Sequence, residues 1–349
     1  MAKLKRWDFK QINRLHSKLL GLFISFVAIA ALPLLVDSPY YVHLLIMVGM
    51  NSILAMTFIL TLRTGFVSLA NAAFWGVGAY ALTLLVTRWD LSVWLALPAS
   101  AVITGIVAFL VGIILVRNAG FAFLMLTALL GMVTVLVFGT FDVFGGYVGI
   151  VNIPAPEPIK LPFLPPIEFI SKTPYYYLMV LLFIIVVAVL STFYAAWSGR
   201  AWRAIDLSPH LAESLGINLF RYRLLAFVLA SAVAGLMGGF YACYFGAVVP
   251  STFDIFKTFY IHIYAILGGI GFAFLGPVIG SFIFTLVPEV LRITKEVEPI
   301  FTGLLLILLV MFLPDGLLSL LSLSRRPSHP GENMERIVRW IKASPRPRG

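Results

Sequence analysis

The side chains that could carry out chemistry are few in this sequence, and their spacing forms no reaction centre. The single cysteine, Cys243, lies in an apolar run, so neither a disulfide framework nor a cysteine-based metal site is available. The sequence has no Gly-x-x-x-x-Gly-Lys loop to cradle a phosphate. The five histidines lack metal-ligand spacing: His16, His43, His210, His262 and His329. We therefore expect no catalytic residue, metal site or cofactor in this chain.

Acidic residues, with which ion-coupled carriers hold a proton or sodium ion, avoid the apolar segments. All 15 Asp and Glu residues fall in loops or near segment ends. Because a carboxylate is costly in lipid and is kept there only for function, this distribution argues against an ion-coupled carrier. His262 is the one ionisable residue well inside an apolar run. A lone histidine is more often a packing residue than a proton relay, so its role in a solute pathway stays a hypothesis.

Two apolar stretches, 68–80 and 231–239, are rich in glycine, alanine and serine. Small residues let helix backbones approach closely, and tight packing explains most of these positions. The alternative is the wall of a solute pathway that slides or rotates. On that interpretation the candidates are Ser68, Asn71, Gly76 and Gly78, and the buried amide of Asn71 is the best polar group among them.

The elements that must position these residues are membrane-spanning helices. Hydrophobic residues make up 61% of the chain and charged residues only 11%, and the mean hydropathy is +1.01. A soluble domain has roughly one-quarter charged residues. The fold class is therefore an all-α polytopic membrane protein. Segments that could cross about 30 Å of hydrocarbon lie near 19–36, 42–62, 66–87, 92–116, 120–139, 174–197, 224–247 and 300–321.

The stretch 256–287 decides the number of spans. Glycines at 268–271 and Gly276-Pro277 weaken helical continuity, so the stretch is either one overlong helix or two short ones. Two helices give about ten spans with both termini in the cytoplasm, and most of the 25 Lys and Arg residues then lie inside. With nine spans the basic tail would lie outside, which the positive-inside rule disfavours. We therefore expect ten.

This topology predicts three parts: a basic cytoplasmic segment at 1–18, a transmembrane domain at 19–322 and a basic cytoplasmic tail at 323–349. The net charge of +10 then reflects topology and contact with anionic membrane lipid, and not nucleic-acid binding.

Two connections are longer than a turn requires. The polar connection 198–223 is about two dozen residues long. Its Ala212 to Gly216 stretch has the pattern of a short helix ended by glycine. Such a helix suits a docking element for a soluble partner. The connection 140–173 is rich in proline and glycine. We expect it to be an ordered extracytoplasmic loop of restricted backbone.

Six separated motifs follow one another along the chain: 65–69 with 72–74 and 78–80, 145–146 to 153–154, 199–201 with 212–218, 268–271, 276–280 and 312–316. In this order they resemble the motifs of the branched-chain amino-acid ABC importer permeases, most closely the longer, M-type subunit. The resemblance covers roughly 40–320. The sequence departs from the family pattern at Ala70-Asn71, where Gly-His is frequent, and at Ser281, where alanine is usual.

The resemblance implies a fold similar to the vitamin B12-type importer permeases. It also implies an importer in the bacterial inner membrane that contains a second permease, two ATPase subunits and a soluble substrate-binding protein, with ATP and magnesium held by the ATPases. Solute would move by alternating access. The residues implied for ATPase coupling are Arg203, Glu213, Ser214, Leu215, Gly216 and Ile217, and those for binding-protein contact are Gly145, Gly146 and Pro154.

Two other functions stay open on the sequence. A permease of a related ABC importer for urea, short amides, sugars or nucleosides would share most of these motifs. A carrier or channel that works without ATP is the mechanistic alternative.

Overall fold

The protein is described here by a computed structural model that covers residues 38–118, 120–158, 168–290, 303 and 316–317. The predicted first span at 19–36 and the terminal segments 1–18 and 323–349 lie outside the described residues. So does the predicted last span at 300–321, apart from residues 303, 316 and 317.

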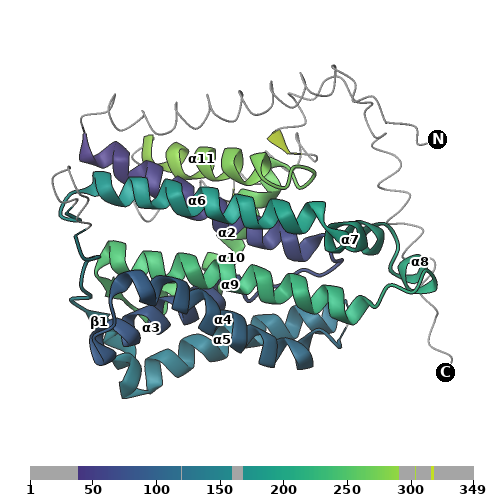
Figure 1. Ribbon diagram of the computed structural model, residues 1–349, viewed down its shortest axis with the longest axis horizontal. Helices are drawn as coiled ribbons and strands as arrows, with labels where there is room; N and C mark the ends of the chain where they lie inside the picture. Colours follow the sequence, from purple (N-terminus) through teal and green to yellow (C-terminus); the bar gives the residue numbers. More distant parts are fainter. Residues whose placement is uncertain (1–37, 119, 159–167, 291–302, 304–315, 318–349) are drawn as a thin grey trace, which may run out of the picture.

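Most helices lie side by side along the longest axis of the molecule, with α7 and α8 at one end and β1 at the other (Figure 1). Within the described residues, five helices are long and apolar enough to cross a membrane: α2, α4, α5, α6 and α9. The predicted all-α polytopic membrane fold is confirmed. The helices are α2 (Pro39–Leu62), α3 (Asn71–Trp89), α4 (Val93–Leu115), α5 (Phe121–Thr140), α6 (Lys172–Ala195), α7 (Trp197–Leu207), α8 (Pro209–Ser214), α9 (Leu219–Phe245), α10 (Ile255–Gly268) and α11 (Leu275–Val290).

One predicted helix start is wrong. The apolar segment 66–87 was expected to be helical from its beginning, but α3 begins only at Asn71. The backbone turns after α2 at Gly65, whose φ of +76° lies in the left-handed region that glycine adopts most readily. Residues 63–70, here called the unwound segment, therefore run back into the apolar bundle without helical structure.

The stretch 256–287 is divided into two helices, as the glycines predicted. α10 ends at Gly268 and α11 begins at Leu275. The backbones of Gly268 and Gly276 are so close that a Cβ on Gly268 would collide with the Gly276 carbonyl. With 14 and 16 residues, each helix is only about 21–24 Å long at 1.5 Å per residue, so the crossing of the membrane by each one stays a prediction.

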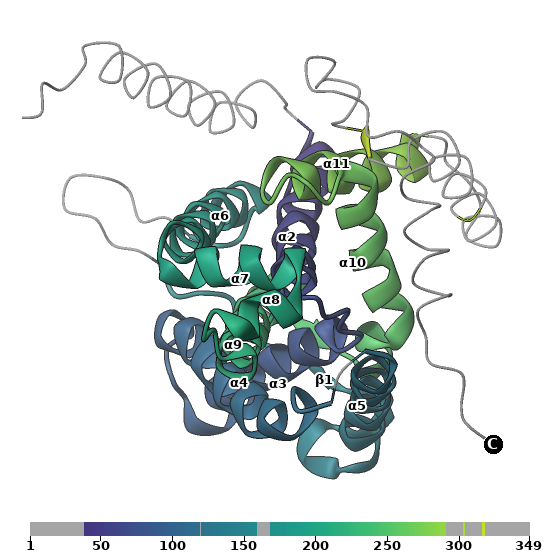
Figure 2. The same cartoon turned by 90° about the vertical axis from the view of Figure 1, so that its right-hand side faces the viewer.

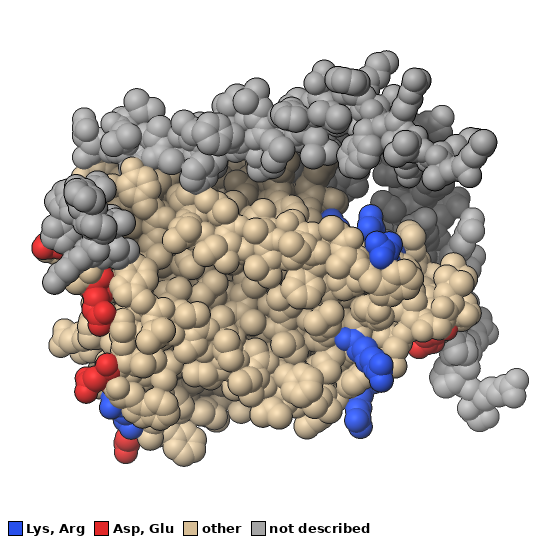
Figure 3. All heavy atoms as spheres, in the orientation of Figure 1, with Lys and Arg blue, Asp and Glu red and all other residues tan. Residues whose placement is uncertain are grey.

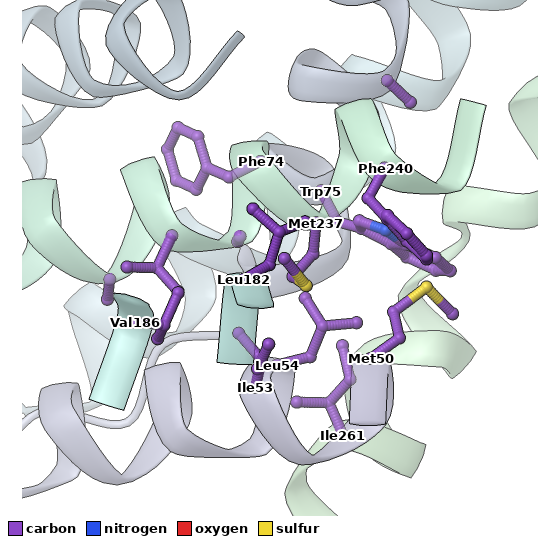
Figure 4. Packing of buried hydrophobic residues seen from close by; sticks show 14 of the residues in the cluster. Met50, Ile53, Leu54, Phe74, Trp75, Leu182, Val186, Met237, Phe240 and Ile261 are labelled. Carbon is purple, nitrogen blue, oxygen red and sulfur yellow. The ribbon is translucent and has the colours of Figure 1, made fainter. Parts of the chain in front are cut away.

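α9 is the central helix of the bundle, and it packs against α2, α3 and α4. The end-on view shows α9 between α4 and α3 on one side and α2 and α7 on the other (Figure 2). Apolar side chains from five helices interlock in the core (Figure 4). Examples are Met50 of α2, Trp75 of α3, Leu182 of α6, Phe240 of α9 and Ile261 of α10, all buried.

A short antiparallel sheet ties the long loop after α5 to the end of α9. β1 (Ile150–Val151) pairs with β2 (Ala247–Val248), with Ile150 opposite Val248. The Ile153 N–H also donates to the Gly246 carbonyl at 3.0 Å. Three 3-10 turns complete this end: η1 (Asp142–Phe144), η2 (Gly146–Val148) and η3 (Pro250–Phe253).

Charged side chains gather at the two ends of the molecule and leave an apolar belt between them (Figure 3). Such a belt matches the hydrocarbon layer of a membrane. The α7–α8 end is mainly basic and the β1 end mainly acidic among the described side chains, which is the distribution that the positive-inside rule gives for the predicted orientation. The first group is Arg63, Arg117, Arg200, Arg203, Arg221 and Arg223 with Asp206 and Glu213, and the second is Asp90, Asp142, Glu157, Glu168 and Asp254 with Arg88, Lys172 and Lys257.

Candidate functional site

The predicted docking connection, 198–223, contains the two helices α7 and α8 (Figure 1). Trp202 of α7 is fully buried, and its indole N–H donates to the Tyr222 carbonyl in the first turn of α9 at 2.9 Å. Ala212 is the buried residue of α8. Glu213, Ser214, Leu215 and Gly216 are all exposed, and Ile217 is half-buried. The connection is thus anchored on the bundle and presents its other side to solvent.

α8 is capped at both ends, so its shape is well defined despite its six residues. At its start, the Ser208 hydroxyl accepts from the Leu211 N–H at 3.3 Å. At its end, the Gly216 N–H donates to Glu213 O at 2.9 Å and the Ile217 N–H to Ala212 O at 3.0 Å. With Gly216 at a φ of +80°, this is a Schellman cap. The helix-ending glycine is confirmed, although the helix begins at Pro209 and not at Ala212.

Two exposed leucines on this connection, Leu207 and Leu211, are residues that sequence reasoning missed, and the predicted Leu215 is exposed as well. Leu207 is 87% exposed, Leu211 61% and Leu215 70%. Apolar residues so exposed beyond the membrane-spanning helices mark a surface that a partner covers. Arg203, predicted for the same role, is exposed on α7, and its guanidinium Nε donates to the Gly199 carbonyl at 3.2 Å. In the sequence Leu207 and Leu211 resemble core positions of short helices, and nothing distinguishes them as exposed.

The unwound segment forms a second candidate region, because its backbone polar groups lie within the apolar bundle and need partners. The Leu69 N–H donates to the Thr127 hydroxyl of α5 at 3.0 Å. The Ala72 N–H, in the first turn of α3, donates to the Thr258 hydroxyl of α10 at 3.1 Å. In lipid, irregular backbone persists only where the protein supplies such hydrogen bonds. Side chains of α5 and α10 thus hold this segment and the start of α3.

Ser68 and Asn71, two predicted pathway residues, lie together at a small pocket beside the unwound segment. The cavity has a volume of about 10 Å³. Asn71 also donates from Nδ2 to the Thr57 hydroxyl at 2.9 Å. Both polar and apolar residues line the pocket: Thr61, Ser68, Asn71 and Ser231 with Phe74, Phe227, Ala230 and Ala234.

His262, a third predicted pathway residue, holds the unwound segment from α10. Its Nε2 lies 3.1 Å from the Ser68 carbonyl oxygen. Since a carbonyl only accepts, Nε2 must carry the proton in this contact. The ring also stacks on Phe58 with 3.9 Å between centroids. Both contacts are those of a packing residue. Through the first of them, His262 supports the backbone of Ser68.

Gly76 and Gly78 are not brought to this pocket. A Cβ on Gly78 would collide with the backbone of Gly235 in α9, and one on Gly76 would crowd the rings of Phe253 and Phe138. These two glycines therefore let α3 pack closely against its neighbours, which is the packing interpretation of the small-residue stretch.

The loop at the opposite end carries the predicted binding-protein contacts. Gly145 and Gly146 are half-buried in it, and Pro154 is exposed. The large exposed apolar side chains of the same loop are Phe141, Val143, Tyr147, Val148, Val151 and Ile170. The glycines shape the loop, and the apolar side chains beside them are the surface that a soluble partner could contact.

Metal chemistry finds no support in the part of the chain that is described, where no three His, Cys, Asp or Glu residues are grouped as a metal site requires. Cys243 is buried and free there.

Comparison with known proteins places this architecture among transport permeases. A sequence model of the family described as "Branched-chain amino acid transport system / permease component" matches residues 40–313. Two proteins described as "High-affinity branched-chain amino acid transport system permease protein LivM" are similar to this chain. Those of Salmonella typhimurium and Escherichia coli are each 25% identical to it, over 295 and 297 residues, which is 79% of this chain and 68% of theirs. No solved structure matches significantly.

The family match spans most of the described helices, from α2 through α11. It agrees with a multi-pass membrane protein that moves solute and is not an enzyme. The chain therefore belongs to the branched-chain amino acid transport permease family.

Proposed function

We propose that this chain is the membrane-spanning permease subunit of an ATP-driven importer for branched-chain amino acids in the bacterial inner membrane. The observation that carries the proposal is the α7–α8 surface, which a permease of this family presents to a soluble partner. Exposed leucines and a rigid capped helix fit insertion into a groove on an ATPase subunit. The complete importer would contain a second permease, two ATPases that hold ATP and magnesium, and a soluble substrate-binding protein.

The described polar groups support an external energy source. Within the described bundle the charged side chains lie at the two ends (Figure 3), and backbone groups in and beside the unwound segment bond to Thr127, Thr258 and His262 of other helices. A proton or sodium ion would need a carboxylate within the bundle. ATP binding by the partner subunits would instead move α7 and α8 and open the passage alternately to each side.

The pocket at Ser68 and Asn71 is our candidate for a point on that passage. Its hydroxyl and amide groups suit the charged end of an amino acid, and Phe74 and Phe227 suit a branched apolar side chain. Its cavity volume of about 10 Å³ is far below the roughly 300–1,000 Å³ of common ligand pockets, so solute passage would have to widen it. Among the described residues no charged side chain lines it to pair with the charged groups of an amino acid, and selectivity would therefore rest mainly with the binding protein.

Competition for uptake tests the substrate class. Cells that express the complete importer should take up labelled leucine, and excess isoleucine or valine should inhibit this uptake. Urea, short amides, sugars and nucleosides serve as the comparison set. Inhibition by one of these, with no effect of isoleucine or valine, would assign the chain to a related importer.

A further inference from the structure

Arg223 joins the docking connection to the unwound segment. It is the last residue of that connection and lies near the start of α9. Its guanidinium Nε donates to the Thr64 carbonyl at 3.2 Å. The guanidinium carbon lies 4.2 Å from the centroid of the Phe66 ring. One side chain thus holds two residues of the unwound segment by two different contacts, a hydrogen bond and a cation–π contact.

The first turn of α9 is also bound to α7 and α8. The fully buried Trp202 of α7 donates to the carbonyl of Tyr222, the residue before Arg223. Both α7 and α8 pack against α9. A displacement of these two helices is therefore transmitted to the start of α9, where Arg223 lies.

The unwound segment, which Arg223 contacts, also forms part of the pocket. Thr64 and Phe66 belong to the same unwound segment as Ser68, whose carbonyl contacts His262 and which lines the pocket. This segment has no internal helix to resist bending, and its hydrogen bonds go to side chains of other helices. Movement of Thr64 would therefore be passed along a few residues to the pocket.

We propose that Arg223 is the positioning residue that couples motion of the docking connection to the translocation pocket. The proposal rests on the proposed function, because it assigns the internal route by which an ATPase would act on the pathway. Arg223 itself touches neither ATP nor solute in this role.

The test is the number of leucine molecules imported per ATP hydrolysed by the purified complete importer in proteoliposomes. Arg223→Gln should assemble and hydrolyse ATP, but the ratio should fall about tenfold, within the usual range of coupling between sites. Arg117→Gln is the matched control. Arg117 makes a similar ring contact at 5.9 Å with Phe220 of α9, but it approaches from the connection between α4 and α5. The ratio of this control should match that of the wild type.

Arg223→Lys covers the case in which the glutamine variant does not assemble. Lysine keeps a positive charge near Phe66 but lacks the Nε–H that reaches Thr64, so the ratio should still fall. An unchanged ratio in an assembled Arg223 variant overturns the inference alone, provided that the wild type imports leucine with ATP. A wild-type complex that imports leucine without ATP overturns the proposed function as well.

Discussion

Among single residues, Gly216 is the position at which a substitution should change the shape of the docking surface without changing the stability of the bundle. A Cβ at this position would meet no atom within 4 Å, so a larger side chain causes no collision in this chain. The cost of Gly216→Leu is instead the left-handed backbone, about 1–2 kcal/mol for most residues. We expect this strain to distort the end of α8, lower ATPase capture by the purified permease, and leave the thermal stability of the bundle nearly unchanged.

Gly216→Asn is the matched variant, because asparagine tolerates the left-handed conformation. It should retain most of the ATPase capture that Gly216→Leu loses. If the leucine variant captures the ATPase and supports substrate-stimulated ATP hydrolysis as the wild type does, α8 is not the coupling element.

Thr258 tests the hydrogen bonds that hold the unwound segment. Its hydroxyl accepts from the Ala72 N–H, which Thr258→Val would leave buried without a partner. Such a loss costs about 1–3 kcal/mol, and we expect a lower unfolding temperature in detergent. Thr134→Val is the control, because the Thr134 hydroxyl donates to Leu130 of its own helix, whose carbonyl can keep its helical bond. Equal unfolding temperatures for the two variants would contradict this role.

Sequence alone could identify Ser68, Asn71 and His262, since polar groups in apolar runs are few. It could not identify Thr127 and Thr258, whose hydroxyls accept from the backbone N–H groups of the neighbouring residues Leu69 and Ala72. A threonine in an apolar helix usually bonds to a carbonyl of its own helix, and nothing local distinguishes the two that reach the unwound segment. Their partners Leu69 and Ala72 are 58 and 186 residues away in sequence.

Among the elements, the contact between α3 and α9 depends on glycine. A Cβ on Gly78 would collide with Gly235, so Gly78→Leu must separate the two helices. We expect destabilisation of at least the roughly 1–3 kcal/mol typical of overpacking, measured by thermal unfolding in detergent. Gly105→Ala on α4 is the control, because its Cβ would lie an ordinary 3.4 Å from that of Ala232. A Gly78→Leu protein as stable as Gly105→Ala would contradict the close packing.

The helices themselves were largely predictable, because long apolar runs and their flanking polar residues fix their approximate limits. The start of α3 was not. Phe66 to Leu69 is as apolar as the helix that follows, and hydropathy cannot distinguish helical from unwound backbone when both are buried. The local signal in the sequence was Gly65. Its meaning became clear only from the structure, where a threonine hydroxyl of α5 bonds to the backbone of the segment.

For the whole molecule, the charge distribution predicts which end faces the cytoplasm. In a Cys243→Ala background, a cysteine replacing exposed Glu213 should react with a membrane-impermeant maleimide only in inside-out vesicles. A cysteine replacing exposed Tyr147 should react in intact spheroplasts. The reverse pattern would invert the topology and remove α7 and α8 from the cytoplasmic side.

The most direct test of the central claim is leucine uptake by the purified complete importer in proteoliposomes, with one component omitted at a time. We predict uptake only when ATP, both ATPase subunits and the binding protein are all present, because the described bundle offers an ion no mid-membrane carboxylate to bind. Uptake by this chain alone, driven by a proton or sodium gradient and indifferent to ATP, would contradict the account.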